Sequence, residues 1–214
     1  MPQASADCEI LVFAKAPVPG EVKTRLIPAL GAQGAARLHS QLVEHALRKA
    51  IASGIGPVTL WSAGDCGHPA FELWRREFGV SLELQKGADL GERMLAAFKR
   101  NAGRPALLIG SDCPSITLRQ LRDCADALRG GADAVFLNAE DGGYGLVGMR
   151  EPLDCIFRNI PWGTSDVMAV TSQRLTDAKL NWRQLATIWD IDRPEDLVRL
   201  GKSGLIDLHT PPLA

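Results

Sequence analysis

Acidic side chains occur at two places in the sequence where a divalent cation could bind. Asp112 lies in the segment IGSDCP, directly after the apolar run 106–110, while Asp190 and Asp192 lie in the segment WDIDRPEDL. Carboxylate oxygens are the ligands that Mg²⁺ and Mn²⁺ prefer, and such a cation can neutralise a diphosphate leaving group. We therefore predict a divalent-cation site with Asp112 as its first ligand and Asp192, slightly favoured over Asp190, as its second.

Both acidic segments also have simpler structural interpretations. Asp112 precedes Pro114 and could be a turn residue whose carboxylate accepts a hydrogen bond from its own backbone. Asp192 precedes Arg-Pro-Glu-Asp and would make a good helix N-cap, followed by acidic residues in the first turn. Because side chains two residues apart share one side of an extended segment, Asp190 and Asp192 can also face one cation. The structural and ligand roles can coexist.

Basic side chains gather in the segment FAKAPVPGEVKTRL, which follows the first apolar run of the chain. In open α/β sheets ligands bind where strands end, so Lys15, Lys23 and Arg25 are placed to hold phosphates. The prolines and Gly20 would stiffen this loop and lower the entropy lost on binding. A solvent-exposed basic loop is the alternative, and the segment matches neither a Walker loop nor GxGxxG.

A third segment, AEDGGYGLVG, is rich in glycine and could let the main chain approach a ligand closely. Glu140, Asp141 and Tyr144 could contact hydroxyl groups of a sugar or of a second substrate there. The Asp-Gly pair is also typical of a plain hairpin turn. Both interpretations stay open from the sequence alone.

Apolar runs alternate with helical patterns along the chain, which is typical of βαβ units and a mostly parallel sheet. No internal repeat or long linker interrupts this alternation, so we expect one α/β domain spanning 1–214. The predicted strands are 9–14, 57–63, 80–85, 106–110, 132–137 and 184–191, with a short strand or hairpin within 142–148. The predicted helices are 31–53, 69–78, 89–101, 117–129, 164–178 and 194–201.

The composition excludes several classes of partner. The 24 basic and 25 acidic residues leave a formal net charge of −1, which creates no field that attracts nucleic acid or a membrane surface. No apolar run approaches the roughly 18 residues of a membrane span, and MPQASADCEI lacks a basic start followed by an apolar run. Five scattered cysteines without CxxC indicate reduced thiols. We expect a cytoplasmic protein of undetermined oligomeric state.

The order and spacing of these segments resemble a known superfamily. The chain is similar, from about Ile10 to Leu200, to the small bacterial transferases of the GT-A or nucleotide-diphospho-sugar transferase superfamily. More narrowly, it resembles the branch found alongside radical-SAM enzymes and labelled arsenosugar-biosynthesis glycosyltransferase. The segments that carry the resemblance are FAKAPVPGEVKTRL, ADLGERM, IGSDCP, EDGGYGLVG, IPWGTSDV and WDIDRPEDL.

The resemblance implies a Rossmann-like three-layer sandwich with a mostly parallel central sheet and a nucleotide pocket over the first strand. It places the metal on Asp112, with Asp192 completing the site. The residues expected to bind the nucleotide and its phosphates are Lys15, Lys23, Arg25, Asp89 and Arg93. The residues expected to contact the sugar or the acceptor are Asp141, Gly143, Tyr144, Trp162 and Thr164.

Two features of the resemblance bear on the type of reaction. Typical GT-A glycosyltransferases carry Asp-x-Asp, whereas Gly110 stands at the first position here, so this turn offers one carboxylate fewer. Small nucleotidyltransferases, such as the guanylyltransferases of molybdenum-cofactor and 2-phospholactate pathways, resemble this chain in the Ser-Asp-x-Pro turn and the late Asp-Ile-Asp-x-Pro-Glu-Asp ending. Their loop is usually richer in glycine than APVPG.

Three functions follow from these observations. The favoured one is a transferase that uses a nucleotide-sugar donor and Mg²⁺ or Mn²⁺, with Asp112, Lys23 and Asp141 as catalytic residues and Asp141 taking a proton from the acceptor. The alternative is a nucleotidyltransferase that joins a nucleoside triphosphate to a phosphorylated small molecule and releases pyrophosphate. The third is a non-catalytic nucleotide-binding protein.

Overall fold

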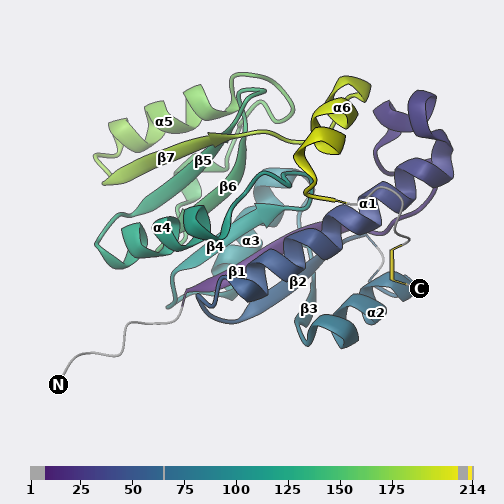
Figure 1. Ribbon diagram of the computed structural model, residues 1–214. Helices are drawn as coiled ribbons and strands as arrows, with labels where there is room; N and C mark the ends of the chain where they lie inside the picture. The colour runs from purple at the N-terminus through teal and green to yellow at the C-terminus, as the bar shows by residue number, and fades with distance from the viewer. Residues whose placement is uncertain (1–7, 65, 207–211, 214) are drawn as a thin grey trace.

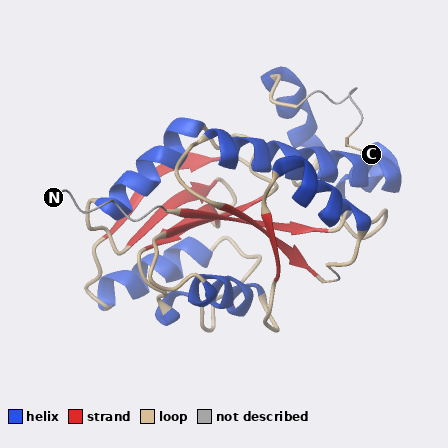
Figure 2. Cartoon of the chain, turned by 90° about the horizontal axis from the view of Figure 1, so that it is seen from below, coloured by secondary structure: helices blue, strands red, loops and turns tan. Residues whose placement is uncertain are grey.

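The computed structural model describes residues 8–64, 66–206 and 212–213, which form a seven-stranded sheet covered by helices on both faces (Figure 1, Figure 2). The strands are β1 Glu9–Lys15, β2 Val58–Ala63, β3 Ser81–Leu84, β4 Ala106–Gly110, β5 Ala134–Ala139, β6 Tyr144–Met149 and β7 Trp182–Ile188. The α-helices are α1 Ile27–Ala52, α2 Pro69–Phe78, α3 Leu90–Arg100, α4 Leu118–Arg129, α5 Val167–Asp177 and α6 Pro194–Ser203. Two short 3-10 helices are η1 Thr24–Leu26 and η2 Asp154–Ile156.

The strand order of this sheet is β3-β2-β1-β4-β6-β5-β7. Strand β6 pairs antiparallel with β4 and with β5, and the other pairings are parallel. The predicted three-layer sandwich with a mostly parallel sheet is therefore confirmed. The carboxyl ends of β1, β2, β4 and β5 meet at one edge of the sheet, where open α/β folds bind their ligands.

Burial on both faces explains why β1 is a continuous apolar run. Ile10 and Val12 pack on one side with side chains of α1, α2 and α4. Leu11 and Phe13 pack on the other side with side chains of α3 and α5. A third cluster joins α6 to the first half of α1 through Leu200 and neighbouring residues, and Figure 1 shows these two helices side by side.

Each predicted strand and helix is present, and the differences lie at the boundaries. Helix α1 begins at Ile27 rather than at residue 31, but Gly31 has a φ of 70° and kinks the helix there. The last strand ends at Ile188 rather than at residue 191. Its end is set by a tertiary contact, because the backbone of Trp189 exchanges hydrogen bonds of 3.0 and 2.7 Å with the hydroxyl of Ser115.

The prediction that Asp192 is the N-cap of the last helix is wrong. Arg193 occupies that position in α6. The carboxylate of Asp196 accepts hydrogen bonds from the backbone N–H groups of Asp192 and Arg193, at 2.9 and 2.7 Å. The helix is therefore capped from inside its own first turn, which leaves the Asp192 carboxylate free for another contact.

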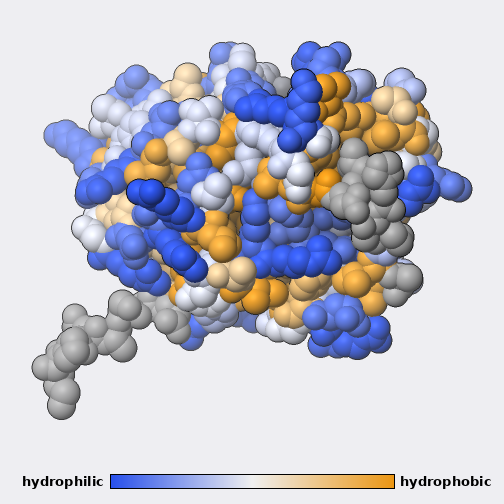
Figure 3. Space-filling view, viewed as in Figure 1, coloured by the Kyte–Doolittle hydropathy of each residue, from blue (hydrophilic) through white to orange (hydrophobic). Residues whose placement is uncertain are grey.

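Within the described ranges, no helix is long and apolar enough to cross a membrane. Figure 3 shows that the face covered by α1, α2 and α4 is largely hydrophilic, with smaller apolar areas between the polar side chains. The five cysteines are free thiols, as the sequence indicates. The first seven residues, which enter the expectation about a leader, lie outside the described part of the chain.

Candidate active site

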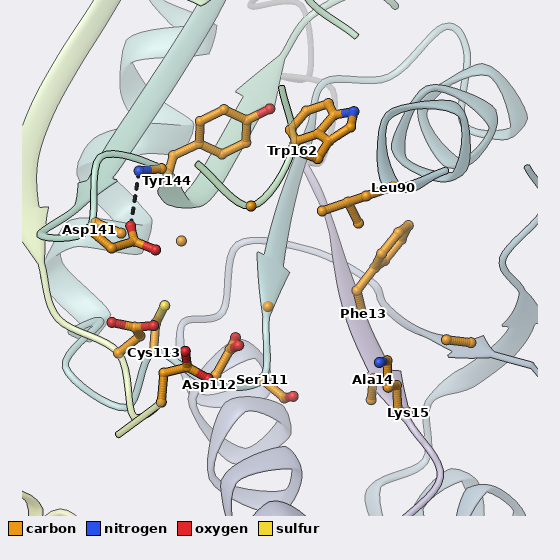
Figure 4. Close-up of a pocket in the computed structure, with 18 of the residues that line it drawn as sticks. Phe13, Ala14, Lys15, Leu90, Ser111, Asp112, Cys113, Asp141, Tyr144 and Trp162 are labelled. Atoms are coloured by element: carbon orange, nitrogen blue, oxygen red, sulfur yellow. Dashed lines mark hydrogen bonds between the residues drawn. The ribbon is translucent and has the colours of Figure 1, made fainter. Parts of the chain in front are cut away.

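A cleft of about 670 Å³ opens at the carboxyl edge of the sheet (Figure 4). Its walls come from β1 and the loop after it, from α1 and α3, from the ends of β4 and β6, and from the segment after β7. The structure thus brings together residues that are up to about 180 positions apart in the chain. The predicted site residues that line this cleft are Lys15, Lys23, Arg25, Arg93, Asp112, Asp141, Gly143, Tyr144, Trp162, Thr164 and Asp192.

Lys23 connects the loop after β1 to the two acidic segments. Its backbone adopts a left-handed conformation with a φ of 47°, and its side chain is only 7% exposed. The ammonium group donates a hydrogen bond to the carbonyl of Ile191 and lies 3.6 Å from a carboxylate oxygen of Asp112. Because Ile191 in turn donates its N–H to the carbonyl of Asp112 at 2.9 Å, these segments form one connected unit.

Asp112 follows the end of β4 by two residues and lines the cleft, with 47% of its side chain exposed. Burial by itself would raise the pKa of its carboxyl group. The Lys23 ammonium, a hydrogen bond from its own backbone and the nearby His39 outweigh that effect and hold the pKa below its usual range. Asp112 is therefore ionised at neutral pH, and the turn interpretation and the ligand interpretation are compatible in this geometry.

Asp190 and Asp192 do not face the same group. The Asp192 carboxylate forms an ion pair with Arg25. Both residues line the cleft, and at Asp190 burial first, and then the charges of Asp112 and Asp141, raise the pKa to about 6. Asp192 is thus paired with Arg25, whereas Asp190 is close enough to Asp112 for the charge of Asp112 to raise its pKa.

These carboxylates fit a divalent cation that is shared with a substrate. The repulsion that Asp112 and Asp141 exert on Asp190 is the electrostatic condition that a bound cation relieves. Among the described residues, no three His, Cys, Asp or Glu side chains form a closed metal cage. Mg²⁺ is usually held by one or two carboxylates together with substrate phosphates, so an open pair such as Asp112 and Asp190 suits it.

Close contacts within the protein require glycine at two positions, one in the turn between β5 and β6 and one at the start of β6. A Cβ on Gly142, which has a φ of 92°, would lie 2.2 Å from the carbonyl oxygen of Ser165. A Cβ on Gly145 would lie 2.4 Å from the Sγ atom of Cys113. Asp141 accepts a hydrogen bond from the N–H of Gly143 at 2.9 Å, drawn as a dashed line in Figure 4. The turn is therefore packed tightly enough to fix Asp141 at the cleft wall.

Trp162 rests on the first turn of α3. A Cβ on Gly91 would lie 2.4 Å from the carbonyl oxygen of Phe157 and 2.8 Å from the indole of Trp162. The ring of Trp162 meets the ring of Tyr144 edge to face, with centroids 6.3 Å apart. This contact gives the ADLGERM segment a structural role, because only glycine at position 91 admits the loop that carries Trp162.

Asp89 and Arg93 of that same segment have different positions. Asp89 is absent from the cleft lining and is the N-cap of α3, where its carboxylate accepts the N–H of Glu92 at 2.8 Å. Its contact with a nucleotide stays a prediction that this geometry does not favour. Arg93 lines the cleft and donates from its Nε atom to the carbonyl of Gly87 at 3.1 Å.

Sequence reasoning missed several polar residues of the cleft, which are Glu21, Thr24, His39, Gln85 and Ser111. His39 of α1 is 5% exposed and makes a 3.0 Å hydrogen bond to the carbonyl of Lys15. Gln85 follows β3 and donates its amide to the carbonyl of Trp61 at 2.8 Å. His39 sits among apolar helix positions and Gln85 sits in an unremarkable loop, so neither carried a local signal.

The sheet order and the cleft define a protein with the nucleotide-diphospho-sugar transferase fold, and solved structures agree. A candidate nucleotide-diphospho-sugar transferase from Desulfovibrio desulfuricans G20 is 31% identical, with a TM-score of 0.84 over 93% of this chain and 88% of that chain. A cytidylyltransferase from Leptospira borgpetersenii is 16% identical, with a TM-score of 0.65 over 96% and 90%. Glucosyl-3-phosphoglycerate synthase from Mycobacterium tuberculosis, solved with Mn²⁺ and uridine diphosphate, is 10% identical, with a TM-score of 0.55 over 92% and 76%.

A comparison with models of protein families shows the family to which the chain belongs. Residues 46–164 match the family described as "Uncharacterized protein conserved in bacteria (DUF2064)". The chain belongs to this family. A search of the curated proteins gave no match.

Proposed function

We propose that the protein is a metal-dependent transferase that uses a nucleotide-sugar donor. The observation that carries this proposal is the meeting, in one cleft, of buried Lys23 with the carboxylates of Asp112 and Asp190. Such an arrangement of one fixed ammonium group beside an open carboxylate pair suits a diphosphate bridged to a cation. The fold shared with the 31% identical candidate nucleotide-diphospho-sugar transferase supports the same class.

Each side of the cleft has a separate task in this mechanism. Lys15, Arg93 and the N–H groups of Arg25 that do not face Asp192 hold the phosphates of the donor by charge-assisted hydrogen bonds. Asp112 and Asp190 would hold the cation, whose positive charge stabilises the departing diphosphate. We assign the second ligand to Asp190 because Asp192 is already paired with Arg25.

Asp141 serves as the general base. Its carboxylate is fixed by the N–H of Gly143 at the cleft wall, on the same side as Tyr144 (Figure 4). A carboxylate that is held in place can accept the proton of an acceptor hydroxyl as that oxygen attacks. Lys23 keeps Asp112 ionised and joins the two acidic segments, so its contribution is to position them.

A nucleotidyltransferase is the second candidate. Its support is the shared fold with the cytidylyltransferase from Leptospira borgpetersenii and the single carboxylate of the Gly110-Ser111-Asp112 turn. The same basic residues would then hold a nucleoside triphosphate. The narrower arsenosugar-type assignment and the cytoplasmic location stay predictions.

Thermal unfolding with and without Mn²⁺ tests the proposal. The protein is titrated with panels of nucleoside triphosphates, nucleoside diphosphates and nucleotide-sugars. A ligand at ~100 times its dissociation constant adds roughly 2.7 kcal/mol of stability, which shifts the melting temperature measurably. We expect a Mn²⁺-dependent shift with one nucleoside diphosphate and its sugar derivatives. A shift with a triphosphate alone would favour nucleotidyl transfer, and no shift with any nucleotide would refute both.

A further inference from the structure

Charge is divided unequally between the two sides of the cleft. The side lined by β1, the loop after it, α1 and α3 is named the donor side, and its charged lining residues are Lys15, Glu21, Lys23, Arg25 and Arg93. The side lined by 139–147 and 162–167 is named the acceptor side. Among the described lining residues of the acceptor side, Asp141 is the charged one, and no Lys, Arg or His is present. Asp112 and Asp190 lie between the two sides.

The acceptor side is a built pocket with polar groups that lack partners within the protein. The hydroxyl of Tyr144 and the indole N–H of Trp162 are buried, and neither makes a hydrogen bond to the described protein atoms. Figure 4 shows the Tyr144 hydroxyl at the end of the ring that is directed toward Trp162 and away from Asp141. Buried polar groups are normally satisfied, so the unpartnered hydroxyl of Tyr144 in this wall indicates a ligand that offers a hydrogen-bonding group, whereas the indole N–H of Trp162 lies against Gly91.

The wall around these groups is rigid. The Tyr144 ring meets Phe136 edge to face at 5.3 Å, and the Trp162 indole lies against Gly91. Ring positions fixed in this way favour a ligand that presents a flat or apolar face together with its hydroxyls. The pocket is thus selective by shape as well as by charge.

The start of α5 does not supply an anion site on this side. A helix N-terminus attracts anions when its first N–H groups are free. Here the N–H of Met168 donates to the carbonyl of Gly142 at 3.0 Å, and Asp166 stands at the N-cap with its own negative charge. A phosphate on the acceptor would therefore meet Asp141, with no basic side chain on the acceptor side to offset it.

We infer, on the basis of the function proposed above, that the acceptor is a neutral or cationic hydroxylated molecule with an apolar ring face, and that its phosphorylated forms are rejected. In the transfer step, the acceptor oxygen bonds to the anomeric carbon of the donor. The bond from that carbon to the diphosphate oxygen breaks, and the diphosphate leaves with both electrons. The hydroxyl proton passes to Asp141. Uncharged acceptors also separate this reaction from nucleotidyl transfer to a phosphorylated molecule.

Matched pairs of small molecules test this inference. The full-length protein is first saturated with Mn²⁺ and the nucleoside diphosphate that gives the largest thermal shift. Binding of glucose and glucose 6-phosphate, ribose and ribose 5-phosphate, and glucosamine is then measured by calorimetry. Because like charges brought together in a cleft cost several kcal/mol, we expect each phosphorylated member to bind at least about tenfold more weakly than its neutral partner. Equal or tighter binding of the phosphorylated members would overturn the inference.

The variant Tyr144→Phe tests whether acceptor binding takes place in this pocket. It keeps the ring that packs on Phe136 and removes the hydroxyl. We therefore expect the unphosphorylated sugars to bind more weakly, while the affinity for the nucleotide stays unchanged. Ser172→Ala, on α5 outside the cleft lining, is the matched loss of a hydroxyl and should leave both affinities unchanged. Absence of nucleotide binding would refute the proposed function itself, whereas nucleotide binding with preference for phosphorylated acceptors refutes the acceptor inference alone.

Discussion

The donor side and the acceptor side of the cleft are held in place by different forces. The donor side depends on polar contacts over long sequence distances, with buried Lys23 bonded to Ile191 and close to Asp112. The acceptor side depends on close packing, with Gly142 against Ser165 and Gly91 against Trp162. The first kind of construction recognises charge, which nucleotides share, and the second recognises shape, which differs between acceptors. Substrate choice in this family should therefore vary mainly on the acceptor side.

The largest expected effect comes from Asp112, which lies where the two sides meet. Asp112→Asn keeps the size of the side chain and removes its charge, so cation-dependent turnover should fall by at least about a hundredfold. Steady-state kinetics at several Mn²⁺ concentrations measure this effect. Asp123→Asn, at an exposed acid of α4, is the control. Full cation-dependent turnover in Asp112→Asn would show that Asp112 does not hold the cation and would refute the proposed mechanism.

Lys23→Met should damage the donor side in two ways. It leaves the Ile191 carbonyl and the Asp112 carboxylate without their shared ammonium group, which should lower the free energy of unfolding by about 2 to 3 kcal/mol. Nucleotide affinity should fall as well, because the acidic segments lose their connection. Urea denaturation and calorimetry with the preferred nucleotide give the two quantities. Lys202→Met, on the exposed end of α6, should change neither. Normal stability in Lys23→Met would contradict the connecting role.

Gly91→Ala should act on the acceptor side through Trp162. The added methyl group meets the Phe157 carbonyl and the indole, so the loop must shift, with a loss of about 1 to 2 kcal/mol in stability. The KM for the acceptor should rise more than the KM for the donor. Gly201→Ala in α6 has open space around its Cβ and should stabilise the protein by roughly 0.5 to 1 kcal/mol. Equal changes in both KM values would show that Trp162 does not separate the two sides.

The smallest expected effect is a pH dependence that arises from His39. Burial, and then the charge of Lys23, lower the pKa of His39 below its ordinary value of 6.5. On acidification the unfolded chain binds this proton before the folded protein does. The contribution is therefore fully present above pH 6.5 and is lost as the pH falls below it.

Denaturation midpoints at pH 7.5 and pH 5.5 measure this dependence. His39→Gln replaces the imidazole with a neutral amide that can still donate toward the Lys15 carbonyl. We expect the variant to lose less stability than the wild type between the two pH values. An identical loss in both proteins would mean that other groups carry the acid sensitivity.

Much of the fold was predictable because its signals are local. Apolar runs such as 106–110 mark buried strands, and capping residues such as Asp89 and Thr117 mark helix starts. Boundaries were less predictable where a tertiary contact decided them. The last strand ends at Ile188 because Ser115, far away in the sequence, binds the backbone of Trp189.

The sequence predicted which residues belong to the candidate site better than it predicted how their side chains pair with one another. The sequence placed Asp112, Lys23 and Asp141 in chemistry-bearing segments, and the structure brings all three to one cleft. It did not show that Asp192 would pair with Arg25 while Asp190 stays unpaired with that arginine and senses the charge of Asp112, because side-chain alternation applies only within a regular strand.

The sequence by itself determined the order of strands and helices, since hydrophobic periodicity and caps act over a few residues. It also determined which residue types stand at the strand ends. Only the tertiary structure decided that Lys23 is buried, that Trp162 lies on Gly91, and that basic side chains gather on one side of the cleft. These properties depend on contacts between segments tens to more than a hundred residues apart, and no local pattern encodes such contacts.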